Sequence, residues 1–432
     1  MTNINTNSLK PNPALGERII AEDVVISNDT RYTGCNNNTL VVGPSGCGKT
    51  GSYVINHLLK PSSSLIVSDT KGLLRNKYEK HLKSLGYSVY CLDFVNPAKS
   101  NCAYNPLRFI RQKKDGTYNE KDIRSIAATL CPVSMESRDP FWPISAQRYI
   151  TMLIGYVLCA LTDDSHTLSQ VCQVHRSIIS GPGWDIIAQF CAINPNSLCA
   201  KLFRQMSNIR EADKTYACIM EFANNALQDF EISDFAPLFE KKNCFDFKTL
   251  GRKKSVLFLN VSDNDPAFDS VMHLLHTQLL QALFDEADSR NDGRLKVPTR
   301  LILDDFAASC KIDGFDRIIS VVRSRDIYID IILQSLSQLS ATYGHYPAKT
   351  IINNCDTVLC FGGTRDTETI VFLSTFLNKP TSSILALDRS RAILIHGSKA
   401  GVVNKLKPYS MDALMLNGGT TGEQYSTNGL PK

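Results

Sequence analysis

Short apolar segments recur along the chain and are separated by stretches long enough to form helices. They are rich in aliphatic and β-branched residues, which is typical of strands buried on both faces of a sheet. Their alternation with helix-length segments predicts an α/β fold with a mostly parallel sheet. The predicted strands are Thr39–Val42, Ser64–Ser68, Ser88–Leu92, Ser255–Val261, Arg300–Leu303, Tyr328–Leu333, Thr357–Phe361 and Ala392–Ile395.

The pattern changes between Leu92 and Ser255, where strand signals are absent and apolar residues recur at three- and four-residue steps. One predicted helix spans Trp142–Leu161. A second is marked by Tyr216, Ile219, Met220, Ala223, Leu227 and Phe230. We therefore expect an all-α domain inserted at residues 110–247, between the first part of an α/β core at 17–109 and its second part at 248–410.

Both ends of the chain are polar. Residues 1–16 are rich in Asn and Pro, and residues 411–432 are rich in Gly, Thr and Ser. Such segments bury too little apolar surface to hold one conformation. We expect a mobile N-terminus and a disordered C-terminal tail.

Composition narrows the class of protein. A chain of 432 residues with 43% hydrophobic content suffices for about two or three globular domains. The net charge of +5 permits binding to nucleic acid but does not by itself indicate it. The fourteen cysteines include no C-x-x-C pair, which argues against a secreted disulfide framework. The longest apolar run, Met152–Leu161, is too short to span a bilayer, so we expect a cytoplasmic protein.

The sequence GPSGCGKT follows the apolar segment TLVV and precedes a helix-compatible stretch, Gly51–Leu59. This is the context that a phosphate-binding P-loop requires. Backbone N–H groups of such a loop surround phosphate oxygens, its lysine reaches the β- and γ-phosphates, and its threonine hydroxyl ligates Mg²⁺. The competing interpretation is a glycine-rich turn with an exposed lysine. The predicted ATP-binding residues are Gly43, Pro44, Ser45, Gly46, Cys47, Gly48, Lys49 and Thr50.

The segment LILDDF at Leu301 has the form of a second P-loop element, an apolar strand that ends in carboxylates. Asp304 then lies beside the phosphates, and we expect it to hold Mg²⁺ together with Thr50, directly or through water. Asp305 is the candidate for orienting the attacking water, a role that a glutamate usually takes. An acidic pair after a strand also serves as a helix N-cap, and the residue pattern leaves that alternative open.

Three further sets of residues are candidates for a part in the same chemistry. Asp69, in the turn SDTKG after a predicted strand, is expected near the nucleotide, or else caps a helix. Gln334 ends a strand and could contact the γ-phosphate or its water. Arg323 and Arg325 precede that strand, so they lie at its opposite end and could act only on a neighbouring subunit, as an arginine finger. A solvated basic turn is the alternative for both arginines.

Several other residues are interpreted as structural. His273 and His276 share one face of a predicted helix at Ala267–Asp288, but without a third ligand they indicate core or interface positions rather than a metal site. Cys355 and Cys360 flank a strand and are interpreted as small buried hydrophobic residues.

The order and the residues of these motifs resemble those of the type IV coupling proteins, the conjugative DNA-transfer ATPases of type IV secretion systems. The resemblance runs from about Glu17 to Tyr409. Its motifs are the P-loop, DTKG at Asp69, YNPL at Tyr104, DPFW at Asp139, LILDDFA at Leu301, VVRSRDIYIDIILQSLSQL at Val321, NNCDT at Asn353 and FGGTRDTET at Phe361.

The resemblance implies a hexameric ring of RecA-like P-loop NTPase cores, each with an all-α domain, that pumps single-stranded DNA by hydrolysing ATP. The implied partners are a relaxase with its DNA complex and the components of the secretion channel. Gln334 matches the family's glutamine after the strand, and Arg323 matches its inter-subunit arginine. The 110–247 insertion occupies the place of the all-α domain.

This chain departs from the family pattern in two ways. Members usually begin with transmembrane helices, whereas only about sixteen residues precede the matching region here. We therefore expect either a separate partner that anchors the protein at the cytoplasmic face of the membrane, or a shortened chain, which could be monomeric in isolation. The second departure is Asp305 in place of glutamate. Two other functions stay open: a nucleotide-gated docking adaptor that scarcely hydrolyses ATP, and a cytosolic motor for chromosome or phage DNA.

Overall fold

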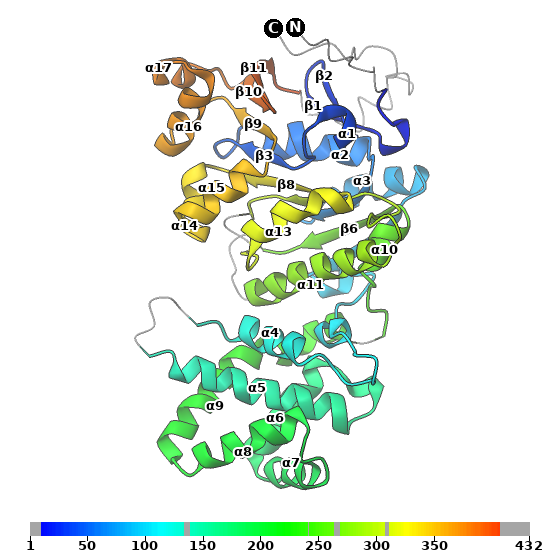
Figure 1. Ribbon diagram of the computed structural model, residues 1–432, viewed down its shortest axis with the longest axis vertical. Helices are drawn as coiled ribbons and strands as arrows, with labels where there is room; N and C mark the ends of the chain where they lie inside the picture. Colours follow the sequence, from blue (N-terminus) through cyan, green and yellow to red (C-terminus); the bar gives the residue numbers. More distant parts are fainter. Residues whose placement is uncertain (1–9, 134–138, 241, 263–267, 307–310, 407–432) are drawn as a thin grey trace, which may run out of the picture. The chain divides into compact units, whose positions relative to one another are not determined.

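The computed structural model describes residues 10–133, 139–240, 242–262, 268–306 and 311–406. Its centre is a nine-stranded sheet with the strand order β11-β10-β9-β3-β8-β7-β4-β6-β5 (Figure 1). The strands are β3 (Thr39–Val42), β4 (Ser64–Ser68), β5 (Ser88–Asp93), β6 (Ser255–Asn260), β7 (Thr299–Leu303), β8 (Ile327–Leu333), β9 (Thr357–Phe361), β10 (Arg391–His396) and β11 (Lys399–Asn404). Every strand predicted from the apolar pattern is present, within one residue of its expected ends.

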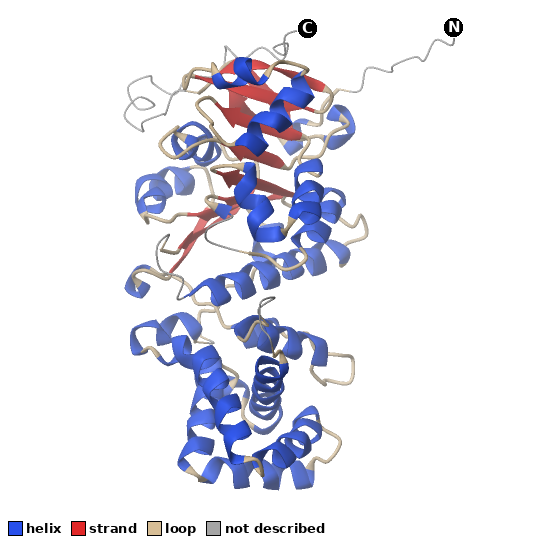
Figure 2. Cartoon of the chain, turned by 90° about the vertical axis from the view of Figure 1, so that its left-hand side faces the viewer, coloured by secondary structure: helices blue, strands red, loops and turns tan. Residues whose placement is uncertain are grey.

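The middle of the sheet is parallel. The pairs β9–β3, β3–β8, β8–β7, β7–β4 and β4–β6 all run in the same direction, whereas β10 is antiparallel to both β9 and β11. All residues of β3, β7 and β8 are buried, because helices cover both faces of the sheet (Figure 2). The expected α/β fold with a mostly parallel sheet is confirmed.

The protein consists of two compact units. The first comprises residues 1–91, 247–263 and 283–432 and contains the sheet. Its helices are α1 (Thr30–Thr33), α2 (Ile55–Leu59), α3 (Leu73–Ser84), α10 (Lys248–Arg252), the end of α11 (Asp269–Asp288), α13 (Phe315–Val321), α14 (Leu336–Tyr343), α15 (His345–Asn353), α16 (Thr367–Leu377) and α17 (Thr381–Leu385).

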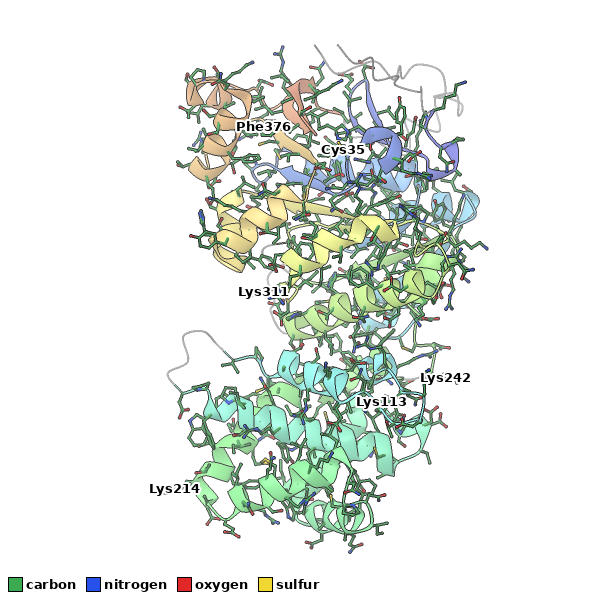
Figure 3. All side chains as sticks on the ribbon, viewed as in Figure 1. Cys35, Lys113, Lys214, Lys242, Lys311 and Phe376 are labelled. Atoms are coloured by element: carbon green, nitrogen blue, oxygen red, sulfur yellow. The ribbon has the colours of Figure 1, made fainter. Side chains whose placement is uncertain are left out.

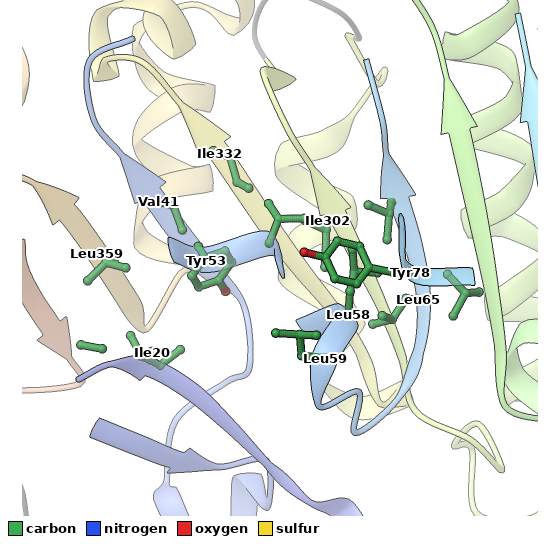
Figure 4. Close-up of a cluster of buried hydrophobic side chains, with 14 of the residues drawn as sticks. Ile20, Val41, Tyr53, Leu58, Leu59, Leu65, Tyr78, Ile302, Ile332 and Leu359 are labelled. Carbon is green, nitrogen blue, oxygen red and sulfur yellow. The ribbon is translucent and has the colours of Figure 1, made fainter. Parts of the chain in front are cut away.

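One face of the sheet packs on a continuous apolar core. Side chains from alternate strand positions, such as Val41, Ile302 and Ile332, meet Leu58 of α2 and Tyr78 of α3 (Figure 4). Alternate residues share a face because successive strand side chains point to opposite sides. This packing fixes α2, and with it the loop that precedes it, against the end of β3.

Three short strands were not expected from the sequence. β1 (Glu17–Ala21) and β2 (Val24–Ser27) form a two-stranded antiparallel sheet joined by a tight turn, in which Asp23 has a left-handed φ of 60°. The edge strand β11 has only Val403 buried. Short strands that are partly polar carry little periodic signal, and tertiary packing decides whether they form.

The second unit comprises residues 92–246 and 264–282 and is largely helical. Its helices are α4 (Glu120–Leu130), α5 (Phe141–Ala160), α6 (Leu168–Ser180), α7 (Pro182–Ile193), α8 (Leu198–Arg210), α9 (Asp213–Leu227) and the start of α11. Helix α5, which the sequence predicted, is buried along most of its length and packs on α4, α6, α8 and α9. Lys113, Lys214 and Lys242 are exposed on this unit (Figure 3).

The main segment of the helical unit runs from Leu92 to Asp246, whereas the expected insertion was 110–247, and α11 contributes to both units. Near the N-terminus, Pro13–Leu15 form a 3₁₀ turn. The expected tail at 411–432 lies outside the described residues. No helix within the described ranges is long and apolar enough to cross a membrane.

Candidate nucleotide-binding site

The loop after β3 has the backbone of a phosphate-binding nest. Gly46 and Gly48 have left-handed φ angles of 72° and 88°, and Cys47 lies between them with a φ outside that region. Alternation of this kind turns successive backbone N–H groups toward one concavity, where an anion can bind. At Gly43 a Cβ would lie 2.7 Å from Cys47 Sγ and 2.9 Å from Phe361 Cβ, so close packing also requires glycine there.

The chain then enters a helix at once. Thr50–Val54 form a π-helical turn that continues into α2. The side chains of Tyr53, Val54 and Leu58 are fully buried in the core, so the helix has a fixed position. Its first turn, with unpaired N–H groups and a positive dipole, follows directly from the loop.

Lys49 and Thr50 lie at the junction of loop and helix. The Lys49 Nζ donates to the Gly43 carbonyl at 2.7 Å and to the Pro44 carbonyl at 3.3 Å. The Thr50 hydroxyl donates to Asp304 Oδ2 at 2.9 Å. The helix that follows the P-loop and the end of β7 are thereby joined, although 254 positions separate the two residues in sequence.

Asp304 and Asp305 follow β7 directly. Burial raises the pKa of the Asp304 carboxyl; the neighbouring Asp305 charge adds to this, while the Thr50 hydrogen bond and Lys49 oppose it. The backbone N–H of Asp305 donates to Asp304 Oδ1 at 3.1 Å, and Asp305 itself has a left-handed φ of 50°. The two carboxylates therefore share one strand end but have different environments.

These residues surround a cavity of about 440 Å³, a volume in the usual range for small-molecule sites. It lies at the carboxyl ends of β3, β4, β7 and β8, the edge where α/β proteins bind ligands. Its lining residues are Ser45, Gly46, Gly48, Lys49, Thr50, Ser68, Asp69, Thr70, Lys71, Leu73, Leu74, Asp304, Asp305 and Gln334.

Most of the residues that the sequence pointed to are among them. Gly43, Pro44 and Cys47 belong to the loop but do not line the cavity. The Cys47 side chain is buried, and burial raises the pKa of its thiol. It packs inward rather than toward the cavity.

Asp69 fulfils both interpretations that the sequence left open. It lines the cavity, and its carboxylate accepts hydrogen bonds from the backbone N–H groups of Leu73, Leu74 and Arg75, at 3.1, 2.9 and 3.1 Å. These are orphan donors in the first turn of α3, so Asp69 acts as a helix cap. The cap fixes the turn that forms one wall of the cavity.

Arg323 and Arg325 lie in a 3₁₀ turn, Val322–Arg325, at the amino end of β8. Neither lines the cavity, as expected from their place before the strand. Arg325 forms a bidentate pair with Asp288, with nitrogen to oxygen distances of 2.8 and 3.1 Å. Arg323 is exposed and donates only to the carbonyls of Thr30 and Gly34, and within the described residues it forms no ion pair.

The histidines and cysteines that were set aside have structural positions. His276 is buried and bonds to the Met272 carbonyl, and burial lowers its pKa to about 4. Among the described residues no group of three or more His, Cys, Asp or Glu side chains could hold a metal ion. Cys355 and Cys360 are buried.

One residue beside the P-loop had no sequence signal. Lys405, directly after the unexpected strand β11, donates from its Nζ to the Cys47 carbonyl at 2.8 Å. A lone lysine near the C-terminus matches no motif, so only the fold places it there.

The fold and this cavity define the class: the protein is a P-loop NTPase with a RecA-like core and additional helices. Within that class, the chain belongs to the family of type IV secretory system conjugative DNA transfer proteins, whose model matches residues 12–416.

Known proteins are similar over most of the chain. It is 24% identical to VirD4 of Rhizobium rhizogenes over 361 residues, or 82% of this chain and 51% of VirD4. It is 25% identical to the conjugal transfer protein TraG of Rhizobium radiobacter, covering 87% of this chain and 57% of TraG. The chain thus spans about half the length of these relatives.

Among solved structures, the plasmid coupling protein TrwB is similar in fold, with a TM-score of 0.66, 15% identity and coverage of 93% of this chain and 91% of that one. TrwB has been solved with the ATP analogue ADPNP, and also with ADP and Mg²⁺.

Proposed function

We propose that this protein is an ATP-hydrolysing coupling protein that moves single-stranded DNA toward a type IV secretion channel. The observation that carries the proposal is the meeting of Lys49, Thr50 and Asp304 at one cavity, in a chain of the conjugative DNA-transfer family. Binding of ADPNP and of ADP with Mg²⁺ by TrwB, which has the same fold, supports ATP and Mg²⁺ as ligands.

The residues present fit Mg²⁺. The ion prefers oxygen ligands and usually keeps several waters, with one or two carboxylates and the substrate phosphates completing its shell. The Thr50 hydroxyl and Asp304 carboxylate lie 2.9 Å apart and supply such oxygens. Burial raises the pKa of Asp304, and a bound dication would favour its ionised form.

The remaining residues have separate roles around the phosphates. Backbone N–H groups of the loop and the Lys49 ammonium neutralise phosphate charge that develops during transfer. Asp305 orients the attacking water, and Gln334, which follows β8, contacts the γ-phosphate or that water. In this proposal Arg323 acts on a neighbouring subunit of a ring.

The partners follow from the family. We propose that the helical segment receives the relaxase and its DNA complex, that the assembled form is a homo-hexamer, and that a separate anchor recruits the protein to the cytoplasmic face of the membrane. Asp305, one methylene shorter than glutamate, supports a second candidate: a nucleotide-gated docking adaptor that binds ATP and hydrolyses little of it.

The deciding experiment measures phosphate release against protein concentration, with and without single-stranded DNA, for the wild type and Lys49→Ala. We expect DNA-stimulated turnover in the wild type and a loss of about 10²-fold or more in Lys49→Ala, since one charge clamp on the transition state is removed. Binding of ATP without turnover in the wild type would favour the adaptor. Unchanged turnover in Lys49→Ala would exclude the P-loop assignment.

A further inference from the structure

Lys405 contacts the P-loop from the side opposite to Asp304. The P-loop strand β3 lies between β8 and β9 in the sheet, and Asp304, Asp305 and Gln334 come from the β8 and β7 side. Lys405 comes from the other side, where β9, β10 and β11 lie. Its Nζ lies 5.7 Å from the centre of the Phe361 ring, at the end of β9.

The backbone around Lys405 is fixed in place. Its own N–H donates to the Ser390 carbonyl at 2.9 Å, and the next residue, Leu406, is 3% exposed. The ammonium therefore reaches Cys47 from an anchored backbone and not from a free end. A hydrogen bond from a charged donor is about twice as strong as one between neutral groups.

The bond to the Cys47 carbonyl determines where the next N–H points. The described peptide bonds are all trans, and in a planar trans peptide the C=O and the following N–H point in opposite directions. Holding the Cys47 oxygen toward Lys405 therefore turns the Gly48 N–H away from Lys405. Gly48 lines the cavity, and within the described part of the chain its N–H donates to no protein atom.

Resting on the proposed ATP binding, we infer that Lys405 is a positioning residue of the phosphate-binding loop: it holds the Cys47–Gly48 peptide so that the Gly48 N–H meets a phosphate oxygen. Gly48 lets this peptide rotate, since its φ of 88° is permitted for glycine without steric cost. A charged anchor outside the loop removes that freedom before the nucleotide arrives.

The position of Lys405 also links two parts of the core. If the bond to Cys47 favours nucleotide binding, then by thermodynamic reciprocity bound nucleotide stabilises the β10–β11 hairpin to the same extent. The stability of the β10–β11 hairpin therefore depends on whether the P-loop holds a nucleotide.

The test uses Lys405→Met, which keeps the apolar stem and removes the donor, with Lys399→Met as the matched control. Lys399 starts β11, the strand that Lys405 follows, and is exposed. Dissociation constants are measured for a fluorescent ADP with Mg²⁺ and, by competition, for inorganic pyrophosphate. We expect both constants to rise about tenfold in Lys405→Met, the size expected for one charge-assisted hydrogen bond, and to stay unchanged in Lys399→Met.

Lys405→Arg, which can still donate to the carbonyl, should recover most of the affinity and serves if the methionine variant fails to fold. Thermal unfolding without nucleotide separates the two roles: a merely structural lysine would lower the midpoint and leave affinity unchanged. Equal affinity in Lys405→Met and wild type overturns the inference, as does weakening of ADP binding without weakening of pyrophosphate binding. A wild type that binds neither ligand would instead overturn the proposed function.

Discussion

Asp305 illustrates how a backbone conformation selects a residue type. Its φ of 50° lies in the left-handed region, which Asp and Asn adopt more readily than other residues with a side chain. At the same position a glutamate, the residue common in related P-loop proteins, would gain reach but lose this conformational preference. Reach toward the attacking water therefore favours a glutamate at this position, whereas the left-handed backbone favours an aspartate.

The first prediction separates the two effects. Asp305→Asn should keep the fold and lower kcat far more than nucleotide affinity, because the charge that orients water is lost while the backbone preference is retained. Asp305→Glu should preserve or raise kcat and destabilise the nucleotide-free protein by about 1 kcal/mol. Steady-state kinetics and urea unfolding measure the two quantities. Equal kcat in all three proteins would show that Asp305 has no catalytic part.

At the scale of elements, a buried polar cluster fastens the β1–β2 hairpin to the sheet. Arg18 of β1 donates to Asn28 at 3.0 Å and to Thr357 of β9 at 3.2 Å. Arg300 of β7 pairs with Asp330 of β8, and both are fully buried. Burial and the Arg300 charge lower the pKa of Arg18 to about 10. Buried pairs of this kind contribute little net stability, but removal of one partner is strongly destabilising because it leaves a buried charge unpaired.

The chain enters and leaves the helical segment along two stretches that lie side by side. Ala103 and Cys244 form an isolated parallel bridge, with Ala103 N–H to the Asn243 carbonyl at 3.0 Å and Phe245 N–H to the Ala103 carbonyl at 2.8 Å. Because the two passages lie side by side, a short linker can replace what lies between them.

Excision of residues 106–242 with a short Gly-Ser linker should leave ATP affinity within a few-fold, since every residue lining the cavity lies in the first unit. The same variant should lose binding to its relaxase partner, measured by co-purification with the DNA complex. Addition of Lys49→Ala to the excised protein is the control for specific nucleotide binding. Complete loss of ATP binding in the folded excised protein would place the segment in the nucleotide core.

In the whole molecule, Arg323 and the cavity lie at opposite edges of the sheet. Arg323 stands at the amino end of β8, and the cavity lies at the carboxyl end of the same strand. A strand of this length spans roughly 20 Å, too far for the guanidinium to reach its own phosphates. Arg325 is held by Asp288, which leaves Arg323 as the candidate for a neighbour's site.

Hydrolysis should therefore depend on assembly. We expect low activity at low protein concentration, a rise with concentration or DNA, and a loss of about 10³-fold or more in Arg323→Ala, the size known for arginine fingers. Arg325→Ala is the matched control and should retain most activity.

Mixing Arg323→Ala with Lys49→Ala subunits gives the sharper measurement. A shared site can combine the intact Lys49 of one subunit with the intact Arg323 of the other, so turnover should partly return. A mixture that stays inactive while the subunits co-assemble would exclude Arg323 as a finger supplied in trans.

The central strands, the P-loop and the carboxylates after β7 could be predicted from the sequence. Buried parallel strands have continuous apolar runs, Asp304 follows one directly and the P-loop with Lys49 follows another, so the local pattern predicts that they lie at one edge of the sheet. The family resemblance, carried by those motifs, was confirmed over residues 12–416. The roles assigned to Asp305, Gln334 and Arg323 stay predictions.

Features that depend on residues distant in sequence became visible only in the folded chain. Strands β1, β2 and β11 are too short or too polar to show a period. β1 and β2 pair with each other and bury apolar residues in the core, and β11 pairs with β10. Cys47 and Lys405 are 358 positions apart, and no local pattern marks a single lysine as the anchor of a loop. Hydrophobic periodicity records which face of an element is buried, whereas the fold alone determines which polar groups meet.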